Sequence, residues 1–120
     1  LQPKVRRLPE FVEYGDYFWQ DPDSYDSGAV DRFWQEDSVT EAMSVWAERL
    51  QEMSQPDATE YENALRECAG EQGIKAATLI HPTRLALTGS GVSPGLFEVM
   101  EVLGHDTVVR RVQNAVEYFS

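Results

Sequence analysis

The spacing of apolar residues along this chain follows the period of a helix almost from end to end. In residues 38–53, for example, Ala42, Trp46, Leu50 and Met53 recur three or four positions apart, which places them on one face of a helix. No segment has the strict alternation of apolar and polar residues, or the run of β-branched residues, that is typical of a strand. The sequence therefore predicts an all-α fold.

About seven helices are expected, separated by prolines, glycines and polar loops. Their approximate ranges are 8–19, 26–34, 38–53, 57–70, 74–88, 93–103 and 106–119. Hydrophobic residues make up 42% of the 120 residues, which is enough to bury a core, and no internal repeat indicates a solenoid. We expect a compact helical bundle in two lobes, residues 1–56 and residues 57–120.

The ends of these segments carry residues that commonly cap helices. The predicted N-caps are Asp26 or Ser27, Ser38 with Glu41 as a capping box, Asp57 or Thr59 with Glu60 or Glu62, Ser93 before Pro94, and Asp106. The predicted helix stops are Gly70, Gly73 and Gly104. A kink or break is expected at His81-Pro82, because proline disfavours the helical conformation of the residue before it. Gly89 and Gly91 flank a tight loop in which a ligand could approach the backbone closely.

Charge is distributed unevenly along the chain, whose formal net charge is −11. Such an excess of acid argues against nonspecific binding to nucleic acid. Residues 1–7, however, hold three basic residues and no acid, and the two signs balance over residues 75–120. Any contact with RNA is therefore expected at the start of the chain or in its last third. The acidic middle is interpreted as a solvated surface, with repulsion that confines an anionic partner to the other faces as the alternative.

Residues that could carry catalysis or hold a metal are scarce. His81 and His105 have no Cys or carboxylate at metal-ligand spacing, so neither a zinc site nor a catalytic residue is predicted. The single cysteine, Cys68, excludes an intrachain disulfide and is expected to be buried on a helix face in a reducing, cytoplasmic setting. No apolar run approaches the roughly 20 residues that a membrane span needs. The start, Leu1-Gln2-Pro3-Lys4, has neither an initiator Met nor an apolar signal segment, so we expect a fragment of a longer protein.

The most distinctive segment is PTRLALTGSGVSPGLFE at residues 82–98, followed after a short helix by Leu103-Gly104. It resembles the signature near the C-terminus of bacterial-type, class I glutamyl-tRNA synthetases. In that family a Pro-x-Arg-x-Ala-Leu-Thr-Gly helix end, a short loop and a Ser/Thr-Pro-x-Leu-Phe-Glu helix start recur. More weakly, residues 4–8 resemble the basic opening of the family's anticodon-binding region, and residues 17–26 its aromatic segment. The resemblance covers essentially the whole chain and is strongest over residues 74–120.

The resemblance implies an all-helical, two-lobed anticodon-binding cage that binds tRNA-Glu as a monomer. By position in the motif, the residues lining the anticodon pocket would be Arg84, Ser93, Pro94 and Leu96, with Arg6 or Arg7 as an early basic contact. The parent reaction would be the ATP-dependent ligation of glutamate to tRNA-Glu, with tRNA-Gln left open as a second acceptor. ATP and Mg²⁺ would bind the catalytic domain of the parent, so this chain would be inactive alone and would hold no metal or cofactor.

Arg84 suits this role, because unpaired bases are recognised by stacking on guanidinium or aromatic planes and by hydrogen bonds to their edges. Its alternative is a surface ion pair with Glu98 or Glu101. Ser93 and Pro94 could equally be an ordinary helix start, and Leu96 an ordinary core residue. Arg110 and Arg111 are expected to point nearer to solvent, with phosphate contact as the alternative for both.

Two positions depart from the family pattern, since Ser90 stands where a basic residue is common and Thr83 where an apolar one is usual. Phosphate contact at this loop is therefore expected to be weaker. The rival interpretation from another class is a helical protein-interaction module with an exposed apolar groove formed by Phe33, Trp34 or Trp46. Trp at helical spacing is more often part of a core. A hydrolase that uses paired acids is a third interpretation and would require turnover by the purified chain.

Overall fold

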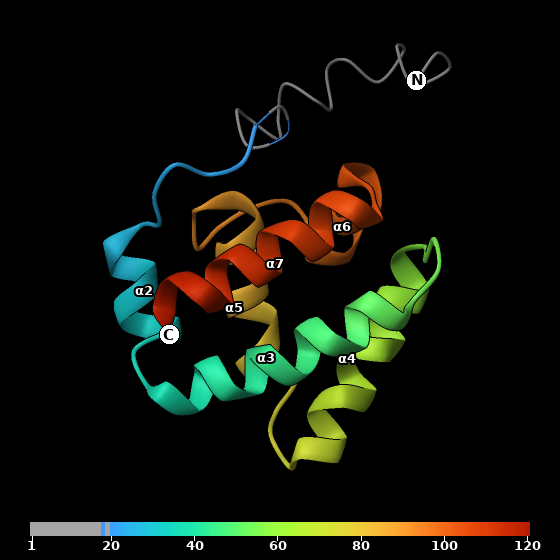
Figure 1. Cartoon of the computed structure of the whole chain (residues 1–120), viewed down its shortest axis with the longest axis horizontal. Helices are drawn as coiled ribbons and strands as arrows, with labels where there is room; N and C mark the ends of the chain where they lie inside the picture. The colour runs from blue at the N-terminus through green and yellow to red at the C-terminus, as the bar shows by residue number, and fades with distance from the viewer. Residues whose placement is uncertain (1–17, 19) are drawn as a thin grey trace.

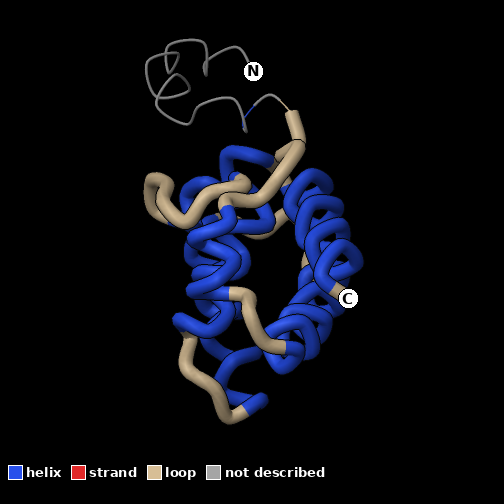
Figure 2. The backbone as a smooth tube through the Cα atoms, turned by 90° about the vertical axis from the view of Figure 1, so that its left-hand side faces the viewer, coloured by secondary structure: helices blue, strands red, loops and turns tan. Residues whose placement is uncertain are grey.

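Helices account for most of the chain that a computed structural model describes, which is residue 18 and residues 20–120. Six α-helices and no strands are present in these residues, as the ribbon in Figure 1 and the rotated view in Figure 2 both show. Their bounds are α2 Ser27–Phe33, α3 Asp37–Glu52, α4 Ala58–Gln72, α5 Ala77–Thr88, α6 Leu96–Leu103 and α7 His105–Phe119. The prediction of an all-α fold is confirmed. The helix expected at residues 8–19 falls, apart from Phe18, outside the described residues.

Helices α3 and α7 pack along each other, and α5 crosses behind both of them in the view of Figure 1. At one end of this group α2 contacts α5. At the other end α4 packs against α3 and α6, and α6 also contacts α7. The loop that joins α5 to α6, residues 89–95, begins on the α2 side of the bundle, where Gly89 and Gly91 lie against residues 22–29, and leads to α6, which packs against α4 and α7.

A single hydrophobic core receives side chains from all six described helices. Its largest fully buried members are Trp46, Tyr61, Met43, Leu50, Leu65, Leu79, Leu85, Leu87 and Met100. Helices on both sides of residue 56 therefore share one core. Trp34 and Trp46 belong to it with 3% and 0% of their surface exposed, so they cannot form the exposed groove that a protein-interaction module would need.

Two of the predicted N-caps are confirmed by their hydrogen bonds. Asp26 caps α2, because its Oδ2 accepts from the Ala29 N–H at 2.9 Å. A reciprocal capping box starts α4: Asp57 Oδ1 accepts from the Glu60 N–H at 2.8 Å, and Glu60 Oε1 accepts from the Asp57 N–H at 2.9 Å. That helix ends at Gly73, which adopts a φ of 72°, whereas Gly70, also predicted as a stop, lies inside the helix.

Three predicted caps are wrong because each helix begins at a different residue. The first helical residue of α3 is Asp37, so Ser38 is already in the first turn and its Oγ donates to Glu36 Oε1 instead. Ser93 lies two residues before Gly95, the cap of α6, and its hydroxyl is engaged within the preceding loop. Asp106 is in the first turn of α7, which Gly104 precedes as the cap position.

The break predicted at His81-Pro82 is absent, since α5 continues through Pro82. A proline in a helix removes one N–H donor. Pro82 and Leu79, which lies three residues before it, are both buried in the bundle, and burial of their apolar side chains favours the continuous helix. Thr83 is buried, and its hydroxyl donates to the Leu79 carbonyl at 2.6 Å, so the hydroxyl is not left unsatisfied in the core.

Candidate functional site

The loop of residues 89–95 is ordered by its own hydrogen bonds. Gly89 ends α5 in the left-handed region with a φ of 77°, and its N–H donates to the Leu85 carbonyl. Thr88 Oγ1 donates to the Arg84 carbonyl at 2.8 Å and accepts from the Ser90 N–H at 3.0 Å. Ser90 Oγ in turn accepts from the Val92 N–H at 3.2 Å. The side chain of Val92, which sequence reasoning did not single out, is 76% exposed at the loop surface.

The chain itself occupies the space beside the two glycines of this loop. A Cβ atom at Gly89 would lie 2.7 Å from the Ser24 carbonyl oxygen, and one at Gly91 would lie 3.1 Å from Ala29 Cβ. The Gly89 carbonyl also accepts from the Asp26 N–H at 2.8 Å. The close approach expected for a ligand is thus made by residues 22–29, which brace the loop from one side.

Arg84 and Ser93 are brought together across the loop. Arg84 Nε donates to Ser93 Oγ at 3.0 Å, and Ser93 Oγ donates to the Pro94 carbonyl at 2.7 Å. The guanidinium is half-buried, and this burial lowers the pKa of Arg84. Its Nη1 lies 3.3 Å from Nδ1 of His81, and since a guanidinium has only donors, Nδ1 must accept and the neutral ring carries its proton on Nε2.

No ion pair involves Arg84 among residues 20–120. The proposed partner Glu101 instead accepts from the Ala58 N–H at 2.9 Å, and Glu98 is exposed without an ion pair in the same part of the chain. The surface-pair alternative for Arg84 is therefore not formed. The guanidinium keeps donors that no described residue uses.

The remaining predicted site residues have different positions. Pro94 is half-exposed beside Ser93, whereas Leu96 is only 3% exposed and packs in the core. Arg6 and Arg7 lie outside the described residues.

A row of three residues that the sequence did not assign to the site, Arg32, Phe33 and His81, reaches Arg84 through His81. The rings of Phe33 and His81 stack at a centroid distance of 4.3 Å and an interplanar angle of 18°. The Arg32 guanidinium carbon lies 5.1 Å from the Phe33 ring centroid. Burial, and then the nearby charges of Arg84 and Arg32, lower the pKa of His81. The contact between His81 and Arg84 could have been predicted from the sequence, because His81 stands one helical turn before Arg84. The position of Phe33 and Arg32 beside His81 could not, because no sequence pattern shows that α2 packs against α5 here.

Arg111 contradicts the expectation of a solvated side chain, since it is 2% exposed. Its Nε donates to Asp21 Oδ1 at 2.8 Å and its Nη1 donates to the Leu87 carbonyl at 2.7 Å. The exposed Arg110 adds two bonds to the same carboxylate, at 2.7 and 3.0 Å. The hydrogen bonds from Arg110, the larger effect, and Arg111 lower the pKa of Asp21 to about 2. Arg111 is buried because the end of α5 and residue 21 both present acceptors to it.

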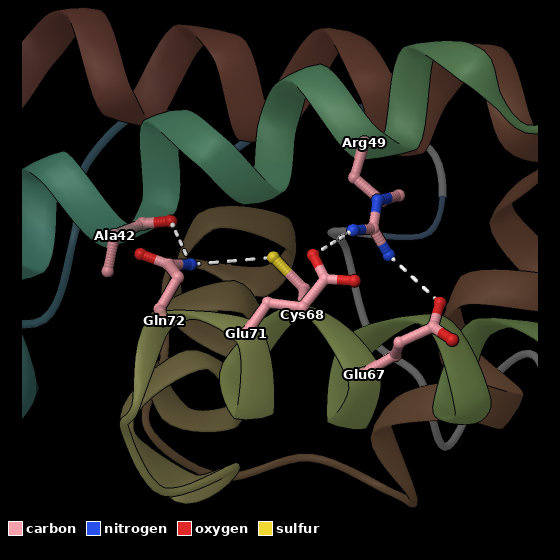
Figure 3. A network of polar contacts seen from close by, with 6 residues as sticks. All are labelled: Ala42, Arg49, Glu67, Cys68, Glu71 and Gln72. Atoms are coloured by element: carbon pink, nitrogen blue, oxygen red, sulfur yellow. Dashed lines mark hydrogen bonds and ion pairs between the residues drawn. The ribbon is translucent and has the colours of Figure 1, made fainter.

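The seam between α3 and α4 carries a separate polar network, drawn in Figure 3. Arg49 of α3 pairs with Glu67 at 3.2 Å and with Glu71 at 2.6 Å. Beside it Cys68 is fully buried, as predicted, and burial raises the pKa of its thiol.

Within the described ranges, no group of three or more His, Cys, Asp or Glu residues is arranged to hold a metal ion. None of the helices in that part of the chain has the length and apolar character to cross a membrane.

Comparison with known proteins connects this geometry to a family. Residues 1–116 match the family model described as the anticodon binding domain. The chain is 37% identical over 117 residues to the glutamate-tRNA ligase of Prosthecochloris aestuarii, covering 98% of this chain and 23% of that protein. It is 38% identical over 120 residues to glutamate-tRNA ligase 1 of Syntrophomonas wolfei, covering 100% and 24% respectively. The chain therefore spans about a quarter of the length of these curated relatives.

A solved structure agrees at the level of the fold. The glutamate tRNA ligase from Elizabethkingia meningosepticum, crystallised in complex with its amino acid, superposes with a TM-score of 0.77 at 19% sequence identity. The match covers 98% of this chain and 22% of that one. The described helices are thus arranged as in one part of that larger protein.

Proposed function

Because the chain belongs to the family of anticodon binding domains, we propose that it binds the anticodon loop of tRNA-Glu and that Arg84 contacts the anticodon bases. One observation carries this proposal: the half-buried Arg84 guanidinium is held by Ser93 and has no carboxylate partner among the described residues. A guanidinium positioned in this way can stack on a base and donate to its edge.

The other contacts of the proposed pocket follow from the motif. Ser93 and Pro94 present the loop surface beside Arg84, and the buried Leu96 supports that surface from the core. Arg6 or Arg7 would add a basic contact from the start of the chain. The division into lobes at residues 1–56 and 57–120 is part of the same proposal.

The choice of tRNA-Glu rests on the relatives, which are glutamate-tRNA ligases. We propose that the chain acts as the C-terminal part of such an enzyme in the cytoplasm. Glutamate would be activated with ATP and Mg²⁺ in another domain and then transferred to the tRNA. This chain by itself would be a monomer without catalytic activity or a metal of its own.

The affinity of an Arg84→Ala variant for tRNA-Glu tests the proposal at fixed salt concentration. We expect a loss of about tenfold or more, because stacking and edge contacts to one base are worth about 1–3 kcal/mol. The matched control is Arg66→Ala, which removes an exposed arginine that pairs with Glu62 on α4. Equal losses in both variants, or none in Arg84→Ala, would contradict a specific role for Arg84.

A second measurement defines the tRNA specificity. Anticodon stem-loops that end in C or in G at the last anticodon position represent tRNA-Glu and tRNA-Gln. A preference for C indicates a parent restricted to tRNA-Glu, and equal affinity indicates one that also accepts tRNA-Gln. Absence of binding to both would count against anticodon recognition by the isolated chain.

A further inference from the structure

The segment that precedes α2, residues 21–26, is anchored at its start by one carboxylate. Asp21 accepts two hydrogen bonds from Arg110, at 2.7 and 3.0 Å, and one from Arg111 Nε at 2.8 Å. Arg111 also donates from Nη1 to the carbonyl of Leu87, in the last turn of α5, at 2.7 Å. One buried guanidinium therefore connects Asp21 to the end of α5.

The same segment is anchored at its other end by the backbone. The Asp26 N–H donates to the Gly89 carbonyl at 2.8 Å. Between the two anchors, the Ser24 carbonyl oxygen and the Pro22 side chain lie so close to Gly89 that an added Cβ atom would approach them to 2.7 and 3.2 Å. Because α5 ends at Gly89, the segment holds the start of the loop that leads to α6.

This loop in turn holds Arg84. Thr88 Oγ1 donates to the Arg84 carbonyl and accepts from the Ser90 N–H, and Ser93 Oγ accepts from Arg84 Nε at 3.0 Å. The direction of the guanidinium thus depends on where the loop places Ser93. A displaced loop would leave the guanidinium free to sample other rotamers, and binding would then have to restore its order.

We propose that Asp21 is a positioning residue for the tRNA site. It anchors residues 21–26 to the end of α5 and so keeps the loop, and through Ser93 the Arg84 guanidinium, in the arrangement that binds the anticodon. The inference rests on the proposed function, because Arg84 is the contact that Asp21 positions. Asp21 makes no contact with RNA itself, since both of its carboxylate oxygens already accept from arginines and would repel a phosphate.

Substitution of Asp21 by Asn has opposite effects on charge and on position. Removal of one negative charge would, by electrostatics alone, strengthen binding to an anionic RNA. Loss of the anchor weakens binding, because the apparent affinity falls with the fraction of molecules whose loop is in the binding arrangement. At fixed salt concentration we expect the affinity of Asp21→Asn for the tRNA-Glu anticodon stem-loop to fall about threefold to tenfold.

Asp23→Asn is the matched control. Asp23 lies in the same segment, is exposed and forms no ion pair among the described residues. Its substitution removes the same charge and leaves the anchor intact, so the affinity should stay equal or rise slightly. Thermal unfolding verifies that both variants are folded at the temperature of the binding measurement.

Two further measurements determine whether Asp21 acts through the loop. In the Arg84→Ala background, the loss caused by Asp21→Asn should become smaller, because the contact that Asp21 positions is then absent. In the free chain, the amide hydrogens of Asp26 and Ser90 donate to Gly89 and Thr88 at the start of the loop. Their exchange with solvent should be faster in Asp21→Asn than in the wild type and in Asp23→Asn.

The possible failures are distinguishable. If Arg84→Ala weakens binding while Asp21→Asn binds as well as the wild type or better, the positioning role is refuted and the proposed function stands. A similar loss in Asp23→Asn, an equal loss from Asp21→Asn with and without Arg84, or unchanged amide exchange also refutes action through the loop. If Arg84→Ala has no effect on binding, the proposed function fails and the positioning role fails with it.

Discussion

Two arginines on neighbouring helices show how the immediate partners of a side chain determine what it can do. Arg84 meets only neutral partners, the Ser93 hydroxyl and the His81 ring. Arg111 is closed in by the Asp21 carboxylate and the Leu87 carbonyl. Arg111 therefore links α7 to Asp21 and to the end of α5, whereas Arg84 keeps hydrogen-bond donors available to a ligand.

Replacing Asp21 with Asn should lower the free energy of unfolding at pH 7 by about 1–2 kcal/mol, because charge-assisted hydrogen bonds to Arg110 and the buried Arg111 are weakened. The partial exposure of Asp21, 35% of its side chain, keeps the expected effect modest. Its folded-state pKa of about 2 lies below the ordinary 3.8, so the carboxylate stabilises the fold above pH 3.8. This contribution is lost as the pH falls toward 2.

Urea denaturation of the wild type and Asp21→Asn at pH 7, 4 and 2 measures this difference. The two proteins should converge at the lowest pH. Asp23→Asn is the matched control, since Asp23 is exposed and forms no ion pair among the described residues, and it should change stability by less than about 0.5 kcal/mol. A difference between wild type and Asp21→Asn that stays constant down to pH 2 would refute the ionic origin of the effect.

At the scale of elements, the ends of the helices depend on which hydrogen bonds compete there. Gly73 and Gly89 both end a helix with similar positive φ, 72° and 77°. Only Gly89 lies against another segment, because a Cβ atom there would meet the Ser24 carbonyl oxygen at 2.7 Å, while one at Gly73 meets nothing within 4 Å.

Alanine substitutions at Gly73 and Gly89 should distinguish the cost of a strained backbone from the cost of a steric clash. Gly73→Ala introduces only the left-handed strain of a residue with a Cβ, about 1–2 kcal/mol. Gly89→Ala adds the clash with residues 22–24 and should cost clearly more in free energy of unfolding, measured by urea denaturation. Equal losses in the two variants would mean that residues 22–24 do not brace the end of α5.

The sequence predicted the elements better than their ends. Ala42, Trp46 and Leu50 lie on the buried face of α3 as their spacing predicts, because burial of an apolar stripe determines a long helix. Ser93 failed as a cap because its hydroxyl bonds to Arg84 and to the Pro94 carbonyl, and a residue type cannot reveal such competing partners.

The candidate site shows the same limit. The motif around Arg84 is local in sequence and could be recognised. The contacts of Arg84 with His81 and of His81 with Phe33 depend on how α2 packs against α5, and helical periodicity carries no information about that packing. The burial of Arg111 could not be predicted from the sequence either, because its partner Asp21 lies 90 residues away in the chain.

At the scale of the whole molecule, one core and several long-range polar contacts cross from one half of the chain to the other. His105, at the start of α7, bonds to the Tyr61 hydroxyl of α4 at 2.9 Å and to the Leu50 carbonyl of α3 at 2.8 Å. Residues before and after position 56 are thereby joined by both apolar and polar contacts.

This continuity predicts that the chain unfolds in a single cooperative transition. Calorimetric and van't Hoff enthalpies should agree, and tryptophan fluorescence and circular dichroism should report the same midpoint. Two separated transitions would instead mean that the proposed lobes, residues 1–56 and 57–120, are independently stable units.

The burial of the single cysteine has a practical consequence for studying this molecule. Cys68 is inaccessible and its thiol is poorly ionised, so it is a weak target for maleimide and other alkylating reagents. A cysteine introduced at the exposed Val92 would then be the one reactive thiol. A fluorophore or spin label attached there would lie next to Ser93 and report the binding of a ligand at the loop. Cys68 would not have to be replaced first.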